Sequence, residues 1–279
     1  AFYLVEMNQL QIPDKDGFCF KYNILELNTA VKPYFLSHLF GKFKIKKLIY
    51  FDPDILILEK VSSLFELLDT NSIILIPHIT EPIIEDNFRP SELDLLQAGT
   101  YNLGFIGLGA TPTTQRLLNW WQKRVYEQCL MAPDRGMHVD QKWMDFVPGL
   151  FGEVFIMREP GYNVAYWNLH SRRVDLLDDR IRVNGEPCYF FHFSGFDPMN
   201  IYKVSKHQNR FTLNDLGQAS RLFEQYRDLL LANAHDQAKN WPYAFGYFDN
   251  GVKIPDIARL MYHALGAERK KFGNPFSTT

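Results

Sequence analysis

The chain has 279 residues and a formal net charge of −2 at pH 7. Hydrophobic residues make up 46% of it and charged residues 22%, which is typical of a globular protein and excludes a disordered chain, a coiled coil or a collagen-like fibre. No apolar run is long enough for a transmembrane helix, and without a basic excess we expect no nucleic-acid partner. The three cysteines are far apart, so we expect no disulfide framework and a cytoplasmic location.

Short apolar runs alternate with helical patterns over the first 200 residues. The predicted helices cover 20–40, 112–128 and 140–146, and the predicted strands cover 2–6, 48–51, 73–77, 102–108, 154–157 and 189–193. This alternation predicts an α/β fold with a largely parallel or mixed sheet flanked by helices. The run 48–51 is nearly all apolar, which is typical of a central strand buried on both faces.

The pattern changes after about residue 200. Helical patterns at 222–232 and 255–265 flank an aromatic segment at 241–248. We therefore predict two parts, an α/β domain over 1–200 and a helical, aromatic-rich appendage over 201–279. The last helix ends in a basic tip at 268–271, which is either a solvated helix end or a point of weak peripheral contact with an anionic membrane.

The strongest chemical feature is Asp52-Pro53-Asp54, directly after the apolar run 48–51. In an extended chain two carboxylates two residues apart point the same way, and Pro53 keeps Asp52 out of the helical region. Ligands of open α/β sheets bind at the carboxyl ends of strands, and Mg²⁺ or Mn²⁺ prefers oxygen ligands. Chance alone yields about one such match in this chain, and we interpret Asp14-Lys15-Asp16 as a solvated turn, so only the strand context favours a metal–diphosphate site.

A second candidate is His192, which is followed by Phe193-Ser194-Gly195. A lone histidine beside a strand is most often a core residue. Here the Ser-Gly loop gives a backbone that can approach a phosphate closely. A histidine also completes a metal site formed by two carboxylates.

Four motifs, taken together and in this order, resemble the family 8 glycosyltransferases and their bacterial relatives. They are Leu48-Ile49-Tyr50-Phe51-Asp52-Pro53-Asp54, Tyr101-Asn102-Leu103-Gly104-Phe105-Ile106, Asp140-Gln141 and His192-Phe193-Ser194-Gly195. The resemblance spans about residues 20–200 and implies the Rossmann-like GT-A fold of nucleotide-sugar enzymes. In that family a first strand holds the base and ribose. It would lie before Phe2, so we expect an N-terminal piece to be missing from this sequence.

The resemblance also implies roles for particular residues. Asp52, Asp54 and His192 would hold Mn²⁺ or Mg²⁺ against the diphosphate of a UDP-sugar. Asp140 and Gln141 would meet the transferred sugar as catalytic residues. For Asp140 the alternative is a helix cap.

Donor-binding positions follow from the same resemblance. Asn102 and Gly104 would line the junction between donor and acceptor, and Lys32 would contact the donor. The alternatives are a strand-end role for Asn102 and a solvated helix position for Lys32. The family's Lys-Pro-Trp after the histidine motif is absent, since Asp197-Pro198 stands there. Our own hypothesis is that Lys206 or Arg210 supplies the missing positive charge to the diphosphate, beside the backbone of the Gly195 loop.

The activity implied is metal-dependent transfer of a sugar from a UDP-sugar to a hydroxyl of a carbohydrate or glycolipid, with retention of configuration. One alternative is a haloacid-dehalogenase-like phosphatase, but Ile55 and the lack of a G-D-x-x-D segment argue against it. The other is a non-catalytic sugar-binding domain, a degenerate transferase. The intact Asp52, Asp54, Asp140 and His192 argue against such decay.

Overall fold

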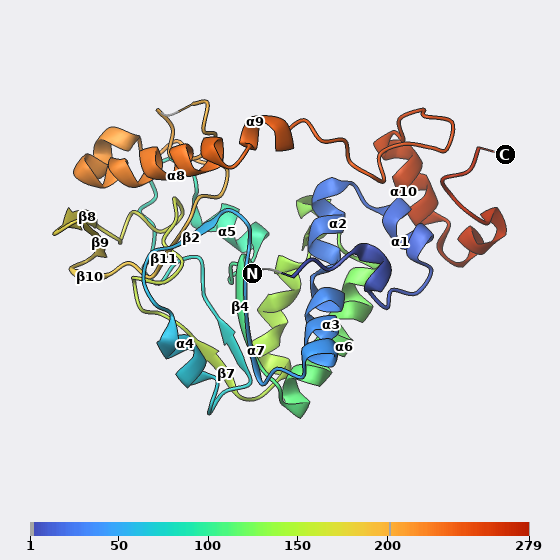
Figure 1. Cartoon of the computed structure of the whole chain (residues 1–279), viewed down its shortest axis with the longest axis horizontal. Helices are drawn as coiled ribbons and strands as arrows, with labels where there is room; N and C mark the ends of the chain where they lie inside the picture. Colours follow the sequence, from blue (N-terminus) through green and yellow to red (C-terminus); the bar gives the residue numbers. More distant parts are fainter. Residues whose placement is uncertain (1–2, 201, 279) are drawn as a thin grey trace.

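The structure is a computed structural model that describes residues 3–200 and 202–278 (Figure 1). Its main sheet has four strands, and one of the two inner strands, β4 (Phe105–Gly109), runs antiparallel to both of its neighbours, while the last pair is parallel. The mixed α/β architecture is therefore confirmed. In spatial order the strands are β1 (Lys47–Phe51), β4 (Phe105–Gly109), β3 (Ile73–Leu75) and β7 (Val154–Ile156).

The predicted helix over 20–40 is wrong as a single element, because the chain forms three helices there. They are α1 (Lys15–Lys21), α2 (Ile24–Ala30) and α3 (Lys32–Phe43). Asn23 causes the first break, since its side chain caps α2 by accepting a hydrogen bond from the backbone N–H of Glu26 at 3.0 Å. Figure 1 shows α3 beside α6 (Pro112–Glu127), and these helices share a core with one face of the sheet.

Strand β1 differs from the prediction in its position. It is an edge strand of the four-stranded sheet, and among its residues only Leu48 is fully buried. Both faces are covered: Leu48 and Tyr50 pack on the helical side, while Ile49 and Phe51 pack on the opposite side. The apolar run correctly indicated that both faces of the strand are covered. It did not indicate whether the strand pairs with a neighbour along one edge or along both, and β1 pairs along one edge only.

The predicted strand over 2–6 is wrong for residues 3–6, which pair with no strand, while Phe2 lies outside the described residues. Tyr3 and Leu4 are largely exposed. The physical reason is that an apolar segment becomes a strand only where a sheet edge accepts its hydrogen bonds.

A second layer of strands lies beside the main sheet. Strand β2 (Ile55–Ile57) pairs antiparallel with β11 (Phe190–His192). Helix α8 (Arg221–Ala232) covers them, with the ring of Tyr226 stacked on Phe193 at 3.8 Å between centroids. The sequence did not predict the adjoining antiparallel sheet formed by β8 (Val174–Leu177), β9 (Arg180–Val183) and β10 (Glu186–Pro187).

The remaining elements are short. Along the described residues, every helix is too short or too polar to span a bilayer. The remaining helices and strands, in chain order, are η1 (Met7–Gln9), α4 (Ser62–Leu67), α5 (Glu92–Ala98), β5 (Met131–Ala132), η2 (Pro133–Arg135), β6 (Met137–His138), η3 (Gln141–Phe146), α7 (Val147–Leu150), η4 (Leu213–Ser220), α9 (His235–Ala238), α10 (Asp256–Ala264) and η5 (Gly266–Phe272).

Helix α10 packs against α1 at the far end of the molecule (Figure 1). The buried side chain of Arg259 joins the two regions. Its guanidinium donates to the backbone carbonyls of Phe20 and Tyr22 at 2.8 Å each and to that of Phe245 at 2.6 Å. These bonds satisfy buried carbonyl groups, of which that of Tyr22 also accepts from the hydroxyl of Tyr243 at 3.2 Å.

Replacing Arg259 with methionine keeps the aliphatic stem and removes all three donors. We expect the free energy of unfolding to fall by about 3 kcal/mol, because hydrogen bonds from a charged donor are lost and buried carbonyls are left unpaired. Urea unfolding of the two proteins measures the difference. Arg173→Met, at a largely exposed position, is the matched control and should change stability by less than about 0.5 kcal/mol. Equal unfolding midpoints for Arg259→Met and the natural chain would contradict this role.

Candidate metal centre

The predicted site residues converge at one end of β1. Because β4 runs antiparallel to β1, the residues that precede β4 lie beside those that follow β1. The backbone N–H of Asp52 accordingly donates to the carbonyl of Gly104 at 2.7 Å. The sheet therefore brings the first two sequence motifs together. It does so through the antiparallel pairing of β1 with β4, and not through parallel strands that end at the same edge.

The segment Asp52-Pro53-Asp54 is a turn, so the predicted extended conformation is wrong. The N–H of Ile55 donates to the carbonyl of Asp52 at 3.1 Å, and Pro53 occupies the second position of this turn, where its fixed φ is favoured. The turn leads directly into β2, where Ile55 pairs with His192. That pairing places His192, from the fourth motif, beside both carboxylates.

Asp52, Asp54 and His192 form what we call the Asp-Asp-His cluster. One donor atom from each lies within 4.8 Å of the others, and Asp54 Oδ1 is 3.0 Å from His192 Nε2. The imidazole is buried, whereas the Asp54 side chain is 40% exposed, so the cluster opens to solvent on the Asp54 side. Burial raises the pKa of Asp54, but the hydrogen bond and charge of His192 outweigh it and hold that pKa below its ordinary value.

The donor set fits a divalent cation with oxygen and nitrogen ligands. Two ligands at right angles on bonds of about 2.1 Å are about 3.0 Å apart, which is the spacing of Asp54 Oδ1 and His192 Nε2. The exposed side leaves positions for further ligands. Two carboxylates with one imidazole could hold Mn²⁺ or Mg²⁺.

Lys32 is buried behind the cluster, so the solvated-helix interpretation of this residue is wrong. Its Nζ lies 3.4 Å from Asp52 Oδ1, 3.4 Å from Asp140 Oδ2 and 3.1 Å from the carbonyl of Leu103. Burial lowers the pKa of Lys32, but the charges of Asp140 and Asp52 outweigh it and raise that pKa above its ordinary value. The ammonium therefore stays charged and offsets part of the negative charge of the cluster.

Asp140 is almost completely buried, and its side chain makes no capping bond to η3, so the helix-cap alternative does not describe it. Burial raises the pKa of Asp140 to about 6, although the charge of Lys32 opposes this. Oδ2 lies at ion-pair distance from Lys32 but has no hydrogen-bond partner. A buried carboxylate oxygen thus remains free to accept one.

Tyr50 is a site residue that the sequence analysis missed. Its hydroxyl donates to Asp52 Oδ1 at 2.6 Å, and the ammonium of Lys32 lies 5.2 Å from the centroid of its ring. Tyr50 precedes Asp52 by two residues along a strand, so the alternation of side chains could have placed the two on one face.

The side-chain amides of Asn102 and Gln141 are hydrogen-bonded to each other. Asn102 Nδ2 donates to Gln141 Oε1 at 3.3 Å, and Asn102 Oδ1 lies 3.2 Å from His192 Nδ1. Gln141 Nε2 donates to the carbonyl of Ala98 at 2.9 Å. Both ends of the Gln141 amide are therefore already occupied within the protein.

The three remaining donor-binding candidates differ in their surroundings. Gly195 has φ +70°, and a Cβ there would lie 2.4 Å from His207, so the loop requires glycine. Lys206 is exposed, and its ammonium has no ion-pair partner in the described part of the chain. Arg210 is held by Asp86, with Nη2 2.8 Å from Oδ1 and Nη1 against Oδ2, and this pairing lowers the pKa of Asp86. Of the two cations, only Lys206 is free to meet a ligand.

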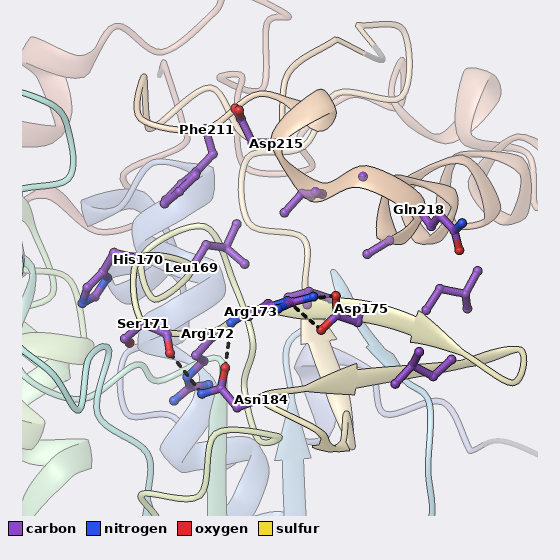
Figure 2. A pocket seen from close by; sticks show the side chains of 16 residues that line it. Leu169, His170, Ser171, Arg172, Arg173, Asp175, Asn184, Phe211, Asp215 and Gln218 are labelled. Atoms are coloured by element: carbon purple, nitrogen blue, oxygen red, sulfur yellow. Dashed lines mark hydrogen bonds and ion pairs between the residues drawn. The ribbon is translucent and has the colours of Figure 1, made fainter.

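A large cavity of about 680 Å³ lies between β8 and η4 and is lined by none of these residues (Figure 2). Its lining is polar, with Arg173 and Asp175 on the β8 side and Asp215 on the η4 side. None of the Asp-Asp-His cluster residues lines it. Size alone therefore does not identify the candidate site in this protein.

His78 is a buried neighbour of Asn102, and burial lowers its pKa from 6.5 to about 4. A neutral buried histidine stabilises the fold fully above its unfolded pKa, and this contribution is lost as the pH falls from 6.5 towards 4. We expect a loss on the order of 3 kcal/mol from this residue. Urea unfolding at pH 7 and pH 4.5 measures it.

His78→Gln cannot take up the proton, so its stability should fall less over this pH range than that of the natural chain. His235→Gln, on α9, is the matched control and should follow the natural chain. Parallel stability losses for His78→Gln and the natural chain would show that His78 does not contribute to the pH dependence.

Comparisons with known proteins find two similar proteins of Bacillus subtilis (strain 168). Uncharacterized protein YfnF is 30% identical over 200 residues, which cover 70% of this chain and 65% of YfnF. Uncharacterized protein YfnD is 27% identical over 170 residues, which cover 60% of this chain and 52% of YfnD. The chain thus matches between half and two thirds of the length of these relatives. No protein-family model matches it, and no solved structure does.

Proposed function

We propose that this protein is a metal-dependent glycosyltransferase of the GT-A fold that moves a sugar from a UDP-sugar to a hydroxyl of a carbohydrate or glycolipid. The observation that carries the proposal is the convergence of four motifs far apart in the sequence. The backbone N–H of Asp52 donates a hydrogen bond to the carbonyl of Gly104. The ring of His192 contacts the side chains of Asp54 and Asn102. The ammonium of Lys32 forms ion pairs with Asp52 and Asp140. The resemblance assigns all of these motifs to one donor site.

Asp52, Asp54 and His192 would hold the cation, with Mn²⁺ as the first candidate. When bound, the cation supplies positive charge that neutralises the departing diphosphate. Lys206 would add a further positive charge, since it is exposed and unpaired among the described residues. The glycine at 195 lets the loop backbone approach the phosphates closely.

Asp140 would orient the transferred sugar. Its Oδ2 accepts no hydrogen bond within the protein, so it could accept one from a hydroxyl of the sugar. The ammonium of Lys32 forms ion pairs with both Asp140 and Asp52, which limits the free-energy cost of burying two negative charges together.

The test is release of UDP from a panel of UDP-sugars, measured with Mn²⁺ and with EDTA. The proposal predicts UDP release from at least one donor with Mn²⁺, loss of release in EDTA, and loss in Asp54→Asn. The haloacid-dehalogenase alternative predicts hydrolysis of p-nitrophenyl phosphate instead. Binding of a UDP-sugar without any release, with or without a hydroxyl acceptor, would favour the non-catalytic alternative.

A further inference from the structure

The two oxygens of the Asp52 carboxylate have different surroundings. Oδ1 accepts a hydrogen bond from the hydroxyl of Tyr50 at 2.6 Å and lies 3.4 Å from Nζ of Lys32. Oδ2 accepts no hydrogen bond from the residues that the structure describes. One oxygen of Asp52 is therefore held within the protein, while the other is free to bind a ligand.

The strand fixes the position of the Tyr50 hydroxyl. Tyr50 pairs with Ile106 of β4, and Asp52 follows two residues later, so the two side chains lie on the same side of the sheet. The ring of Tyr50 packs against the core that the sheet shares with α3 and α6. The ammonium of Lys32 lies 5.2 Å from the centroid of this ring. A packed ring on a paired strand therefore presents the hydroxyl to Oδ1.

Lys32 is the weaker of the two partners of Oδ1. Its Nζ is farther from Oδ1 than the Tyr50 hydroxyl, and it is shared with Asp140 Oδ2 at 3.4 Å and with the carbonyl of Leu103 at 3.1 Å. An ammonium has three donors, and these three acceptors use all of them. The short hydrogen bond from Tyr50 is therefore the main restraint on the orientation of the carboxylate.

A carboxylate with one oxygen held in this way offers a cation one ligand atom instead of two. Mg²⁺, and Mn²⁺ like it, takes about six ligands on bonds of about 2.1 Å. Ca²⁺ takes about six to eight oxygens at about 2.3–2.6 Å and often binds both oxygens of a carboxylate. The hydrogen bond to Oδ1 therefore disfavours Ca²⁺ more than it disfavours the smaller cations.

We propose that Tyr50 is a positioning residue that holds Oδ1 of Asp52, leaves Oδ2 for the cation, and so favours Mn²⁺ or Mg²⁺ over Ca²⁺. Tyr50 acts through Asp52 and does not itself bind the cation. The inference rests on the proposed function for the presence of a cation, and it adds the residue that selects which cation binds.

The test compares the whole natural chain with Tyr50→Phe, which keeps the ring and removes only the hydroxyl. Calorimetric titrations of Mn²⁺ and of Ca²⁺ give the two affinities. The affinity for Mn²⁺ should fall by about 10- to 100-fold, as is typical when the partner behind a metal ligand is lost. The affinity for Ca²⁺ should fall by a smaller factor or rise, because the released Oδ1 supplies a further ligand. The ratio of Mn²⁺ affinity to Ca²⁺ affinity should therefore fall.

Tyr22→Phe is the matched control, at a buried position outside the Asp-Asp-His cluster. The Tyr22 hydroxyl donates to the carbonyl of Val125 at 2.7 Å, so this variant also loses one buried hydrogen bond of a tyrosine. Its urea midpoint should fall, but the ratio of the two affinities should stay that of the natural chain.

The inference is overturned if the natural chain binds Mn²⁺ and Tyr50→Phe leaves the ratio unchanged or raises it. An equal loss of both affinities, for example, would show a general defect of the site without selection between cations. Failure of the natural chain to bind Mn²⁺ would instead overturn the proposed metal site, and this inference with it.

Discussion

Replacing Asp54 with asparagine is expected to lower the affinity for Mn²⁺ by at least about 100-fold, because even residues behind a metal ligand contribute about 10- to 100-fold. The substitution keeps the shape of the side chain and removes the negative charge that faces His192 Nε2. Calorimetric titration of Mn²⁺ measures the effect directly. The free energy of unfolding should change little, because the Asp54 side chain is partly exposed.

The chain contains its own control for this experiment. Asp14-Lys15-Asp16 has the same spacing of aspartates, but it lies at the start of α1, where Asp14 accepts a hydrogen bond from the N–H of Gly17 at 3.3 Å. Asp16→Asn should therefore leave the affinity for Mn²⁺ unchanged. If Asp54→Asn and Asp16→Asn bind Mn²⁺ equally well, the Asp-Asp-His cluster is not the metal site.

Replacing Gly104 with alanine should disrupt the site through packing rather than charge. A Cβ at this position would lie 2.4 Å from His192 Cε1 and 2.9 Å from Asn102 Oδ1, so the imidazole must move. Overpacking of this kind costs about 1–3 kcal/mol of stability. We expect that loss together with a weaker affinity for Mn²⁺, measured by urea unfolding and by calorimetry.

Gly41→Ala is the matched control for this substitution. Gly41 lies inside α3, and a Cβ there would meet no atom within 4 Å. Alanine should raise stability by about 0.5–1 kcal/mol at this position, since it favours the helix. A Gly104→Ala protein with natural stability and natural Mn²⁺ affinity would show that His192 does not depend on the close approach of Gly104.

Local sequence patterns predicted the strands of the main sheet and singled out Asp52, Asp54 and His192 as candidate metal ligands, whereas the other candidate site residues came from the resemblance. The apolar run before Asp52 and the later runs that became β3, β4 and β7 each form a strand near the predicted place. These patterns succeed because a strand with a buried face needs apolar residues on that face, whichever strands it pairs with. Turn chemistry was harder, since Pro53 fits both the extended segment that we predicted and the turn that forms.

The relations between distant segments could not be predicted from the residues alone. The edge position of β1 and its antiparallel pairing with β4 depend on the whole sheet, and this register is what sets Asp52 beside Gly104. The burial of Lys32 likewise requires two carboxylates from other elements to compensate its charge. A helical pattern around Lys32 carries no sign of those partners.

Calorimetric titration of UDP into the natural chain, with Mn²⁺ and with EDTA, tests the proposed site most directly. A cation held by the cluster should bind the diphosphate, so we predict UDP binding that needs Mn²⁺ and is lost in Asp54→Asn. UDP binding of equal strength in EDTA, or Mn²⁺-dependent binding that Asp54→Asn leaves intact, would contradict a metal–diphosphate site formed by Asp52, Asp54 and His192.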